Sequence, residues 1–216
     1  DYCFYNCSKI KEIRLTDKIT YIGQYAFENC AEISEIYLGN IISYIGPDIF
    51  KNCNCLATLR YNIIDYKNSL LNQTTLILGE TPFKKVIIGD DVLSIPDFFV
   101  YNCKTLSQVS FGRNLKKIGY CSFAYCDNLV SLTLPESTSK LSESSFAGCI
   151  RMRNVNIPDN IETIPVAAFY GCTSLSSIII PESVKLIDKD AFSGCSNLIT
   201  AVIGRNVSEI NHNAFK

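Results

Sequence analysis

The sequence contains no tryptophan, a single histidine and no apolar run approaching the length of a membrane span. A membrane helix needs about 20 consecutive apolar residues, so we expect no membrane insertion within this segment. Because His212 is the single histidine, the sequence excludes most Ser-His-Asp catalytic triads and nearly all zinc hydrolase sites. Gly-rich phosphate loops and the His-Glu-x-x-His and Gly-x-Ser-x-Gly motifs are missing as well. These absences predict a protein that is not an enzyme and that holds no cofactor or metal.

An excess of charge of either sign is also missing. The 20 Lys and Arg residues are balanced by 21 Asp and Glu residues, for a net charge of −1. A nucleic-acid binder should show a basic face, so no nucleic-acid partner is expected. The apolar fraction of 47% excludes intrinsic disorder, and 216 residues suit one domain or two small ones.

Cysteine, in contrast, is abundant and periodic. Eight of the 11 cysteines keep one spacing of 23 residues, and phenylalanine precedes most of them by three positions. Self-similarity at a fixed period is typical of repeat proteins. These eight residues, called the cysteine column below, are Cys7, Cys30, Cys53, Cys103, Cys126, Cys149, Cys172 and Cys195.

Apolar residues recur at fixed positions counted from each cysteine: +3, +6, +8, +12, +15, +19 and +20. Positions +6 and +8 alternate with polar neighbours, which is the pattern of a short strand, and Gly or Pro often follows at +9. The pattern therefore predicts a strand at +6 in each of nine repeats. After Cys172 the apolar residues are Leu175, Ile178, Ile180, Val184, Ile187, Ala191 and Phe192.

One repeat, at about residues 54–80, departs from this spacing. A register without cysteine resumes at Glu80 and places Phe83 and Val86 at the expected offsets. Residues 68–78 read as two short apolar strands around an Asn-Gln turn, which predicts a small hairpin inserted on the outer side. Because the sequence shows no linker, we expect a single domain over residues 1–216.

A single 23-residue unit cannot bury its own apolar face, but stacked units share a continuous core. We therefore expect a solenoid whose aligned strands form a parallel sheet, with about 4.8 Å between strands. The segment around the +20 phenylalanine is expected to form one helical or 3₁₀ turn. Polar residues at +11 are expected to satisfy backbone groups that the sheet leaves unpaired.

The repeat between Leu175 and Cys195 resembles the BspA-like (treponemal-type) leucine-rich repeat family. Its motif is L-x-x-I-x-I-P-x-x-V-x-x-I-x-x-x-A-F-x-G-C. The resemblance covers nearly the whole chain and fails only around residues 62–80. It implies a right-handed leucine-rich-repeat solenoid with its parallel sheet on the concave face. It also implies a cell-surface or secreted location and adhesion to host matrix or cell-surface proteins, but fold alone does not determine function.

The cysteine column has two interpretations, disulfides or buried free thiols. Neighbouring Cβ vectors in a parallel ladder point the same way, which is poor disulfide geometry, so the sequence favours free thiols. Three cysteines lie outside the column. Cys3 occupies the small-residue position +19 and should be buried. Cys55 and Cys121 should face outward, as reactive thiols or as exposed bystanders.

Function is expected on the concave face, at strand positions +5 and +7. The first three repeats place Arg14, Tyr37 and Arg60 side by side, and Arg and Tyr are enriched at binding hot spots. A cation–π contact between them is possible, and the alternative is an ordinary solvated face. The predicted partner-binding residues are Glu12, Arg14, Glu35, Tyr37, Thr58, Arg60 and Lys85.

Two further surface groups are weaker candidates. Tyr21, Tyr25 and Tyr44 form an expected tyrosine cluster on the outer side, and Ile179 and Val202 form an apolar patch near the C-terminus. Both chain ends interrupt a repeat, which predicts a fragment of a longer array. The alternative is that partners or end-to-end self-association cover the open ends.

The sequence therefore predicts a non-catalytic adhesion or recognition module that binds a protein or other macromolecule. One alternative is an intracellular interaction scaffold, because reduced thiols persist in that compartment. The other is a structural spacer.

Overall fold

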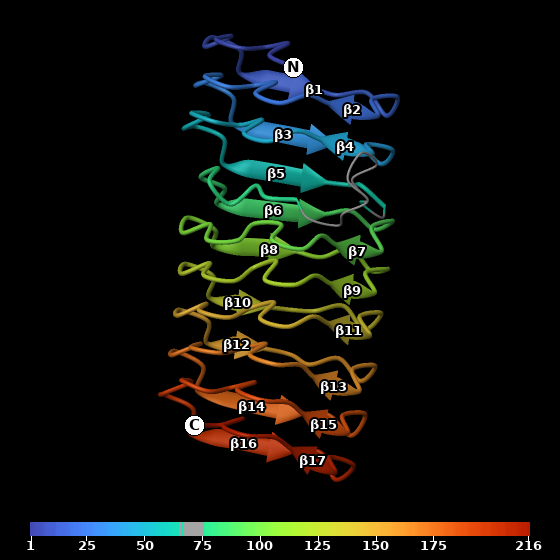
Figure 1. Ribbon diagram of the computed structural model, residues 1–216, viewed down its shortest axis with the longest axis vertical. Coiled ribbons are helices and arrows are strands. Elements are labelled where there is room, and N and C mark those ends of the chain that lie inside the picture. Colours follow the sequence, from blue (N-terminus) through green and yellow to red (C-terminus); the bar gives the residue numbers. More distant parts are fainter. Residues whose placement is uncertain (65, 67–75) are drawn as a thin grey trace.

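The computed structural model describes residues 1–64, 66 and 76–216, which form an elongated stack with its termini at opposite ends (Figure 1). Short strands lie in two columns along the stack. The first column comprises β1 (Glu12–Arg14), β3 (Glu35–Leu38), β5 (Thr58–Tyr61), β6 (Lys85–Ile88), β8 (Gln108–Ser110), β10 (Ser131–Leu132), β12 (Asn154–Val155), β14 (Ser177–Ile180) and β16 (Thr200–Ile203). These strands confirm the prediction of a strand at +6 in every repeat.

The strands of the first column pair in parallel and keep the repeat register. Glu12 of β1 lies opposite Glu35 of β3, and Glu35 lies opposite Thr58 of β5. The hydrogen-bonded order β1-β3-β5-β6-β8 forms the longest sheet, and β10-β12 and β14-β16 continue the column as separate pairs. Alternate residues point into the core, so Ile36 and Leu38 are buried while Tyr37 between them faces outward.

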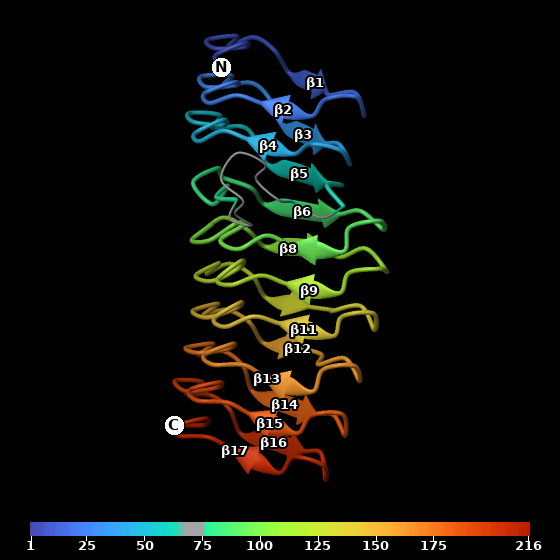
Figure 2. The same ribbon diagram turned by 45° about the vertical axis from the view of Figure 1, so that its right-hand side comes forward.

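A second column of parallel strands, not predicted from the sequence, lies beside the first (Figure 1) and comes to the front in the turned view (Figure 2). Each of its strands has two residues at positions +14 and +15, too few for an alternating pattern to show. The strands are β2 (Tyr21–Ile22), β4 (Tyr44–Ile45), β7 (Ser94–Ile95), β9 (Lys117–Ile118), β11 (Lys140–Leu141), β13 (Thr163–Ile164), β15 (Leu186–Ile187) and β17 (Glu209–Ile210).

The third side of each repeat is a turn that bonds to the next repeat. The backbone N–H groups of Ser144, Phe146 and Gly148 donate to carbonyl oxygens of the following turn, at 3.0, 3.0 and 2.6 Å. Positions +18 and +22 have positive φ, as in Ser144 (54°) and Gly148 (69°). Because residues in this left-handed region interrupt a right-handed helix, the predicted helical or 3₁₀ turn is wrong, and the described residues contain no helix.

The core runs the length of the stack and is built from columns of like side chains. Phe146 is completely buried between Phe123 and Phe169, with both ring centroids at 5.6 Å. The Cys149 thiol donates a hydrogen bond to the Phe123 carbonyl oxygen at 3.2 Å. Six further thiols of the cysteine column make the same kind of bond to a backbone carbonyl of the preceding repeat: Cys30, Cys53, Cys103, Cys126, Cys172 and Cys195. These bonds fit the prediction of free thiols.

The structure corrects two of the three predictions for the remaining cysteines. Cys3 is exposed, because among the described residues its turn is covered on one side, by the turn that contains Ala26. Cys121 is 8% exposed and packs with Ala124, Ala147 and the partly buried Phe98. Its φ of 49° is shared by exposed Asp48 (54°) at the equivalent position, so the neighbouring side chains, and not the backbone conformation, bury Cys121. Cys55 is exposed, as predicted.

Polar residues at +11 do satisfy backbone groups, as predicted. Ser183 donates to the Ile161 carbonyl oxygen at 2.7 Å, and Asn206 donates to that of Glu182 at 2.8 Å. In the irregular repeat the register from Glu80 is confirmed, since Phe83 and Val86 are fully buried.

The predicted hairpin over residues 68–78 lies outside the described residues except for its last three positions. The N–H groups of Leu76 and Leu78 donate to the carbonyl oxygens of Asp97 and Phe99, at 3.0 and 2.9 Å. These two residues therefore belong to the ladder of turns.

Two glycines at +22 allow a matched stability test. Gly148 and Gly171 have φ values of 69° and 67°, so alanine at either position is strained by about 1–2 kcal/mol. A Cβ at Gly148 would also lie 2.5 Å from Cδ1 of Tyr125, whereas one at Gly171 would have 3.9 Å to its nearest neighbour. Gly148→Ala should therefore lower the free energy of unfolding more than Gly171→Ala does, as measured by urea denaturation. Equal losses would contradict this contact.

Candidate functional site

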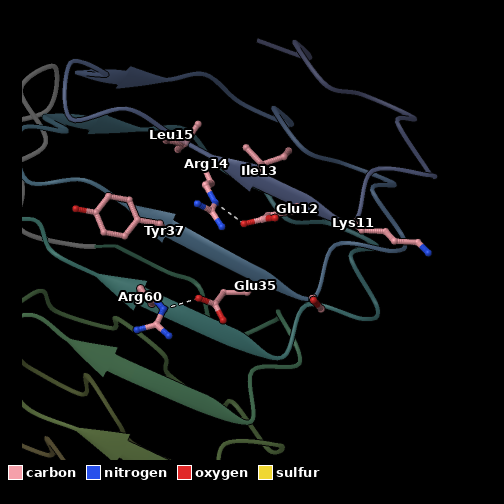
Figure 3. A pocket seen from close by; sticks show the side chains of 9 residues that line it. Lys11, Glu12, Ile13, Arg14, Leu15, Glu35, Tyr37 and Arg60 are labelled. Atoms are coloured by element: carbon pink, nitrogen blue, oxygen red, sulfur yellow. Dashed lines mark hydrogen bonds and ion pairs between the residues drawn. The ribbon is translucent and has the colours of Figure 1, made fainter.

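The predicted partner-binding residues lie together on the outer face of β1, β3, β5 and β6. The parallel register places Arg14, Tyr37 and Arg60 in one row and Glu12, Glu35 and Thr58 in the next (Figure 3). Five of the seven predicted residues line a hollow of about 780 Å³, called the charged hollow below. The hollow is lined by Lys11, Glu12, Ile13, Arg14, Leu15, Ser34, Glu35, Tyr37 and Arg60.

Thr58 and Lys85 continue the row beyond the hollow. Lys85 of β6 lies opposite Thr58 of β5, and its side chain is exposed. Sequence reasoning missed the lining residues Lys11, Leu15 and Ser34, because it considered positions +5 and +7 only.

Both arginines of the charged hollow are held by glutamates. The Nε–H of Arg14 donates to Glu12 on the same strand, and that of Arg60 donates across the sheet to Glu35 (Figure 3). These ion pairs take the place of the expected cation–π contact with Tyr37. The hydrogen bond to Glu12 raises the pKa of the Arg14 guanidinium. Because these side chains are exposed, the pairs add little stability and mainly orient the guanidinium groups.

Tyr37 is the half-buried centre of the charged hollow. Its hydroxyl donates to Oδ1 of Asp17 at 3.1 Å. Burial raises the Tyr37 pKa, and the hydrogen bond to Asp17 raises it further, so the phenol stays neutral. Asp17 comes from the bend of the preceding repeat and was not predicted. Only the stacking of repeats brings it to a residue 20 positions later in the chain.

The apolar candidate patch near the C-terminus also borders a hollow. Ile179 and Val202 lie opposite each other on β14 and β16 and are 68% and 53% exposed. They line a hollow of about 700 Å³ together with Ser131, Thr133 and Asn156.

The three tyrosines expected to form one cluster belong to two. Tyr21 and Tyr44 stack on the second strand column, with ring centroids 4.6 Å apart. Tyr25 stacks instead on Tyr2 in the ladder of turns, at 5.1 Å. The separation arises because Tyr21 is on β2, whereas Tyr25 belongs to the turn that follows it.

Among residues 1–64, 66 and 76–216, no group of three or more His, Cys, Asp or Glu side chains could hold a metal ion. Nor does this part of the chain form a helix with the length and apolar character of a membrane span.

The stacked parallel strands and continuous core define a leucine-rich-repeat solenoid. The chain belongs to the BspA-type leucine-rich repeat family, whose model matches residues 1–93 and 93–216 in six copies. The family and the fold are those of repeat scaffolds that are generally non-catalytic. None of the curated proteins compared with this chain matches it.

This chain is similar to several solved structures of leucine-rich repeat proteins, and the first of those described below shares its fold. A protein from Bacteroides ovatus is 23% identical over 100% of this chain, with a TM-score of 0.59, and the chain covers 66% of that protein. A leucine-rich cell surface protein from Faecalibacterium prausnitzii is 20% identical over 94% of this chain and 68% of its own, with a TM-score of 0.39. The Treponema pallidum leucine-rich repeat protein is 19% identical over 89% of this chain and 67% of its own, with a TM-score of 0.40.

Proposed function

We propose that this chain is a recognition module of a cell-surface or secreted adhesion protein and that it binds a protein partner through the charged hollow. The observation that carries the proposal is the convergence of Arg14, Tyr37 and Arg60 from three neighbouring strands. Arginine and tyrosine are the residue types enriched at binding hot spots. Membership in the BspA-type family supports an interaction role.

The electrostatics of the hollow also support a binding role. Its two glutamates hold the guanidinium groups before any partner arrives, so fewer side-chain rotations are lost on binding. Tyr37 is held in the same way by Asp17. A surface that is ordered in advance binds with a smaller entropy cost than a flexible one.

Simultaneous replacement of Arg14, Tyr37 and Arg60 by alanine tests the proposal. We expect binding to immobilised extracellular-matrix proteins, measured by surface plasmon resonance over a panel, to weaken at least tenfold, since hot-spot residues contribute about 2 kcal/mol or more each. The matched control replaces Gln108 and Ser110 of β8, exposed residues further along the same face, and should bind normally.

Unchanged binding by the triple variant would exclude the charged hollow as the partner site. The proposed location has a separate test, in which an antibody against this chain is applied to intact source cells. Labelling without permeabilisation is expected, and labelling only after permeabilisation would favour an intracellular scaffold.

A further inference from the structure

We propose that the charged hollow takes an acidic segment of the partner, with two carboxylates held by the guanidinium groups of Arg14 and Arg60. This inference rests on the proposed function and names the chemistry of the partner. It follows from the terminal N–H donors of the two arginines, from the spacing between the arginines and from the low net charge of the hollow.

Each arginine keeps its terminal amino groups for a ligand. In the described part of the chain, the hydrogen bond of each guanidinium to a glutamate uses Nε only. The two terminal nitrogens of a guanidinium form a planar pair of donors that matches the two oxygens of a carboxylate. The side chains of Arg14 and Arg60 are 85% and 46% exposed, so a ligand can reach both.

The spacing of the arginines selects the conformation of the segment. Arg14 of β1 and Arg60 of β5 are separated by β3, which places them two strand spacings apart, roughly 9.5 Å. Residues i and i+3 of a polyproline II helix lie on one face about 9.3 Å apart. Residues i and i+2 of an extended strand are only about 6.8 Å apart. The arginine pair therefore fits a polyproline II segment running along the stack.

Tyr37 fits the same ligand, because it lies between the two arginines in the register. Grooves that dock proline-rich segments are lined by aromatic rings. The ring of Tyr37 lines the hollow beside the two guanidinium groups, and its hydroxyl donates to Asp17 (Figure 3). A prolyl ring between the two acidic residues can pack on this aromatic surface.

The charge around the hollow favours isolated carboxylates over a polyanion. Glu12 and Glu35 offset the two arginines, and Lys11 is the third basic residue of the lining. A sulfated polysaccharide or a nucleic acid binds a dense basic stripe, which this hollow lacks. Two separate carboxylates need only the two guanidinium groups that are present.

Synthetic peptides test the inference without a known partner. The probe is a fluorescent proline-rich peptide with two glutamates three residues apart, and its controls have the glutamates two apart or replaced by glutamine. Fluorescence anisotropy at low ionic strength should show at least tenfold tighter binding of the probe than of either control. Arg14→Ala and Arg60→Ala should each weaken probe binding at least tenfold.

Two further variants separate recognition from folding and from net charge. Arg14→Lys keeps the charge but loses the planar pair of donors, so it should recover only part of the affinity. Arg113→Ala removes an exposed arginine whose partner is Asp90 and should leave probe binding unchanged. Circular dichroism of each variant confirms that the solenoid is folded.

Equal affinity for the two glutamate spacings, or binding that survives both alanine substitutions, would overturn the inference. Binding of heparin through the same arginines, without binding of the peptide, would assign the hollow to a sulfated polysaccharide instead. If the peptides fail while matrix-protein binding still depends on Arg14, Tyr37 and Arg60, the carboxylate assignment is wrong and the proposed function stands. If the triple variant binds matrix proteins normally, the proposed function fails.

Discussion

Raising the pH from about 9 to about 11 is expected to unfold the solenoid, because its thiols must stay protonated inside the core. Burial raises the pKa of Cys53 and of Cys195 to about 11 and raises that of Cys149 well above its usual value. Seven thiols of the cysteine column share this raised pKa with burial as the first cause: Cys30, Cys53, Cys103, Cys126, Cys149, Cys172 and Cys195.

The sign of the effect follows from proton binding. An unfolded cysteine ionises near pH 8.5, whereas the folded thiols stay protonated to higher pH, so the native state binds more protons. The stability from these groups is complete below the unfolded pKa and is lost as the pH rises through the folded pKa. Each thiol whose folded pKa lies well above this window contributes about 1.4 kcal/mol per pH unit, so the five with the largest shifts contribute about 7 kcal/mol per unit: Cys53, Cys126, Cys149, Cys172 and Cys195. That slope is comparable to the entire stability of a typical domain.

Urea denaturation in a reducing buffer at several pH values between 8 and 10.5 measures this slope. The slope should become shallower by about 1.4 kcal/mol per pH unit in Cys149→Ala, because that variant lacks one buried thiol. Cys55→Ala should keep the full slope, because Cys55 is exposed. A slope that is the same in Cys149→Ala as in the unmodified chain would show that other groups cause the alkaline transition.

Replacing Phe146 with alanine is expected to lower the free energy of unfolding by about 3–5 kcal/mol, the usual cost of removing a buried aromatic ring. The ring is fully buried and stacks on Phe123 and Phe169 in the neighbouring repeats. Its removal leaves a cavity in the middle of the stack and breaks two ring contacts. Because each repeat contacts only its neighbours, the loss weakens the interfaces on both sides.

Phe215 provides the matched control for the Phe146 substitution. It occupies the same repeat position but is 38% exposed, and within the described part of the chain its ring stacks on Phe192 alone, at 5.2 Å. Phe215→Ala should therefore cost less than half as much in the same urea denaturation experiment. Equal costs for the two variants would show that stacking in the interior of the column adds nothing to stability.

The periodic features of the fold could be predicted from the sequence because they depend on spacing alone. Any residue 23 positions from another occupies the neighbouring repeat at the same place, so the row of Arg14, Tyr37 and Arg60 follows from counting. The same counting placed Cys149 and Phe146 in the core.

Features that depend on local backbone conformation could not be predicted in this way. The turns form a hydrogen-bonded ladder instead of a helical turn because positions +18 and +22 adopt left-handed conformations. Cys121 was placed outside by its repeat position, but Ala124, Ala147 and Phe98 of the turns cover its thiol.

By itself, the sequence determined the period, the column of each residue and the merging of the repeats into one core, because these follow from regular hydrophobic spacing. Only the tertiary structure decided which side chains meet across the repeats. The pairing of Arg60 with Glu35 and the hydrogen bond from Tyr37 to Asp17 depend on the direction in which these side chains extend toward the neighbouring repeat. Packing and electrostatics in three dimensions set these side-chain directions, and they give the charged hollow two guanidinium groups that are each held by a glutamate through Nε.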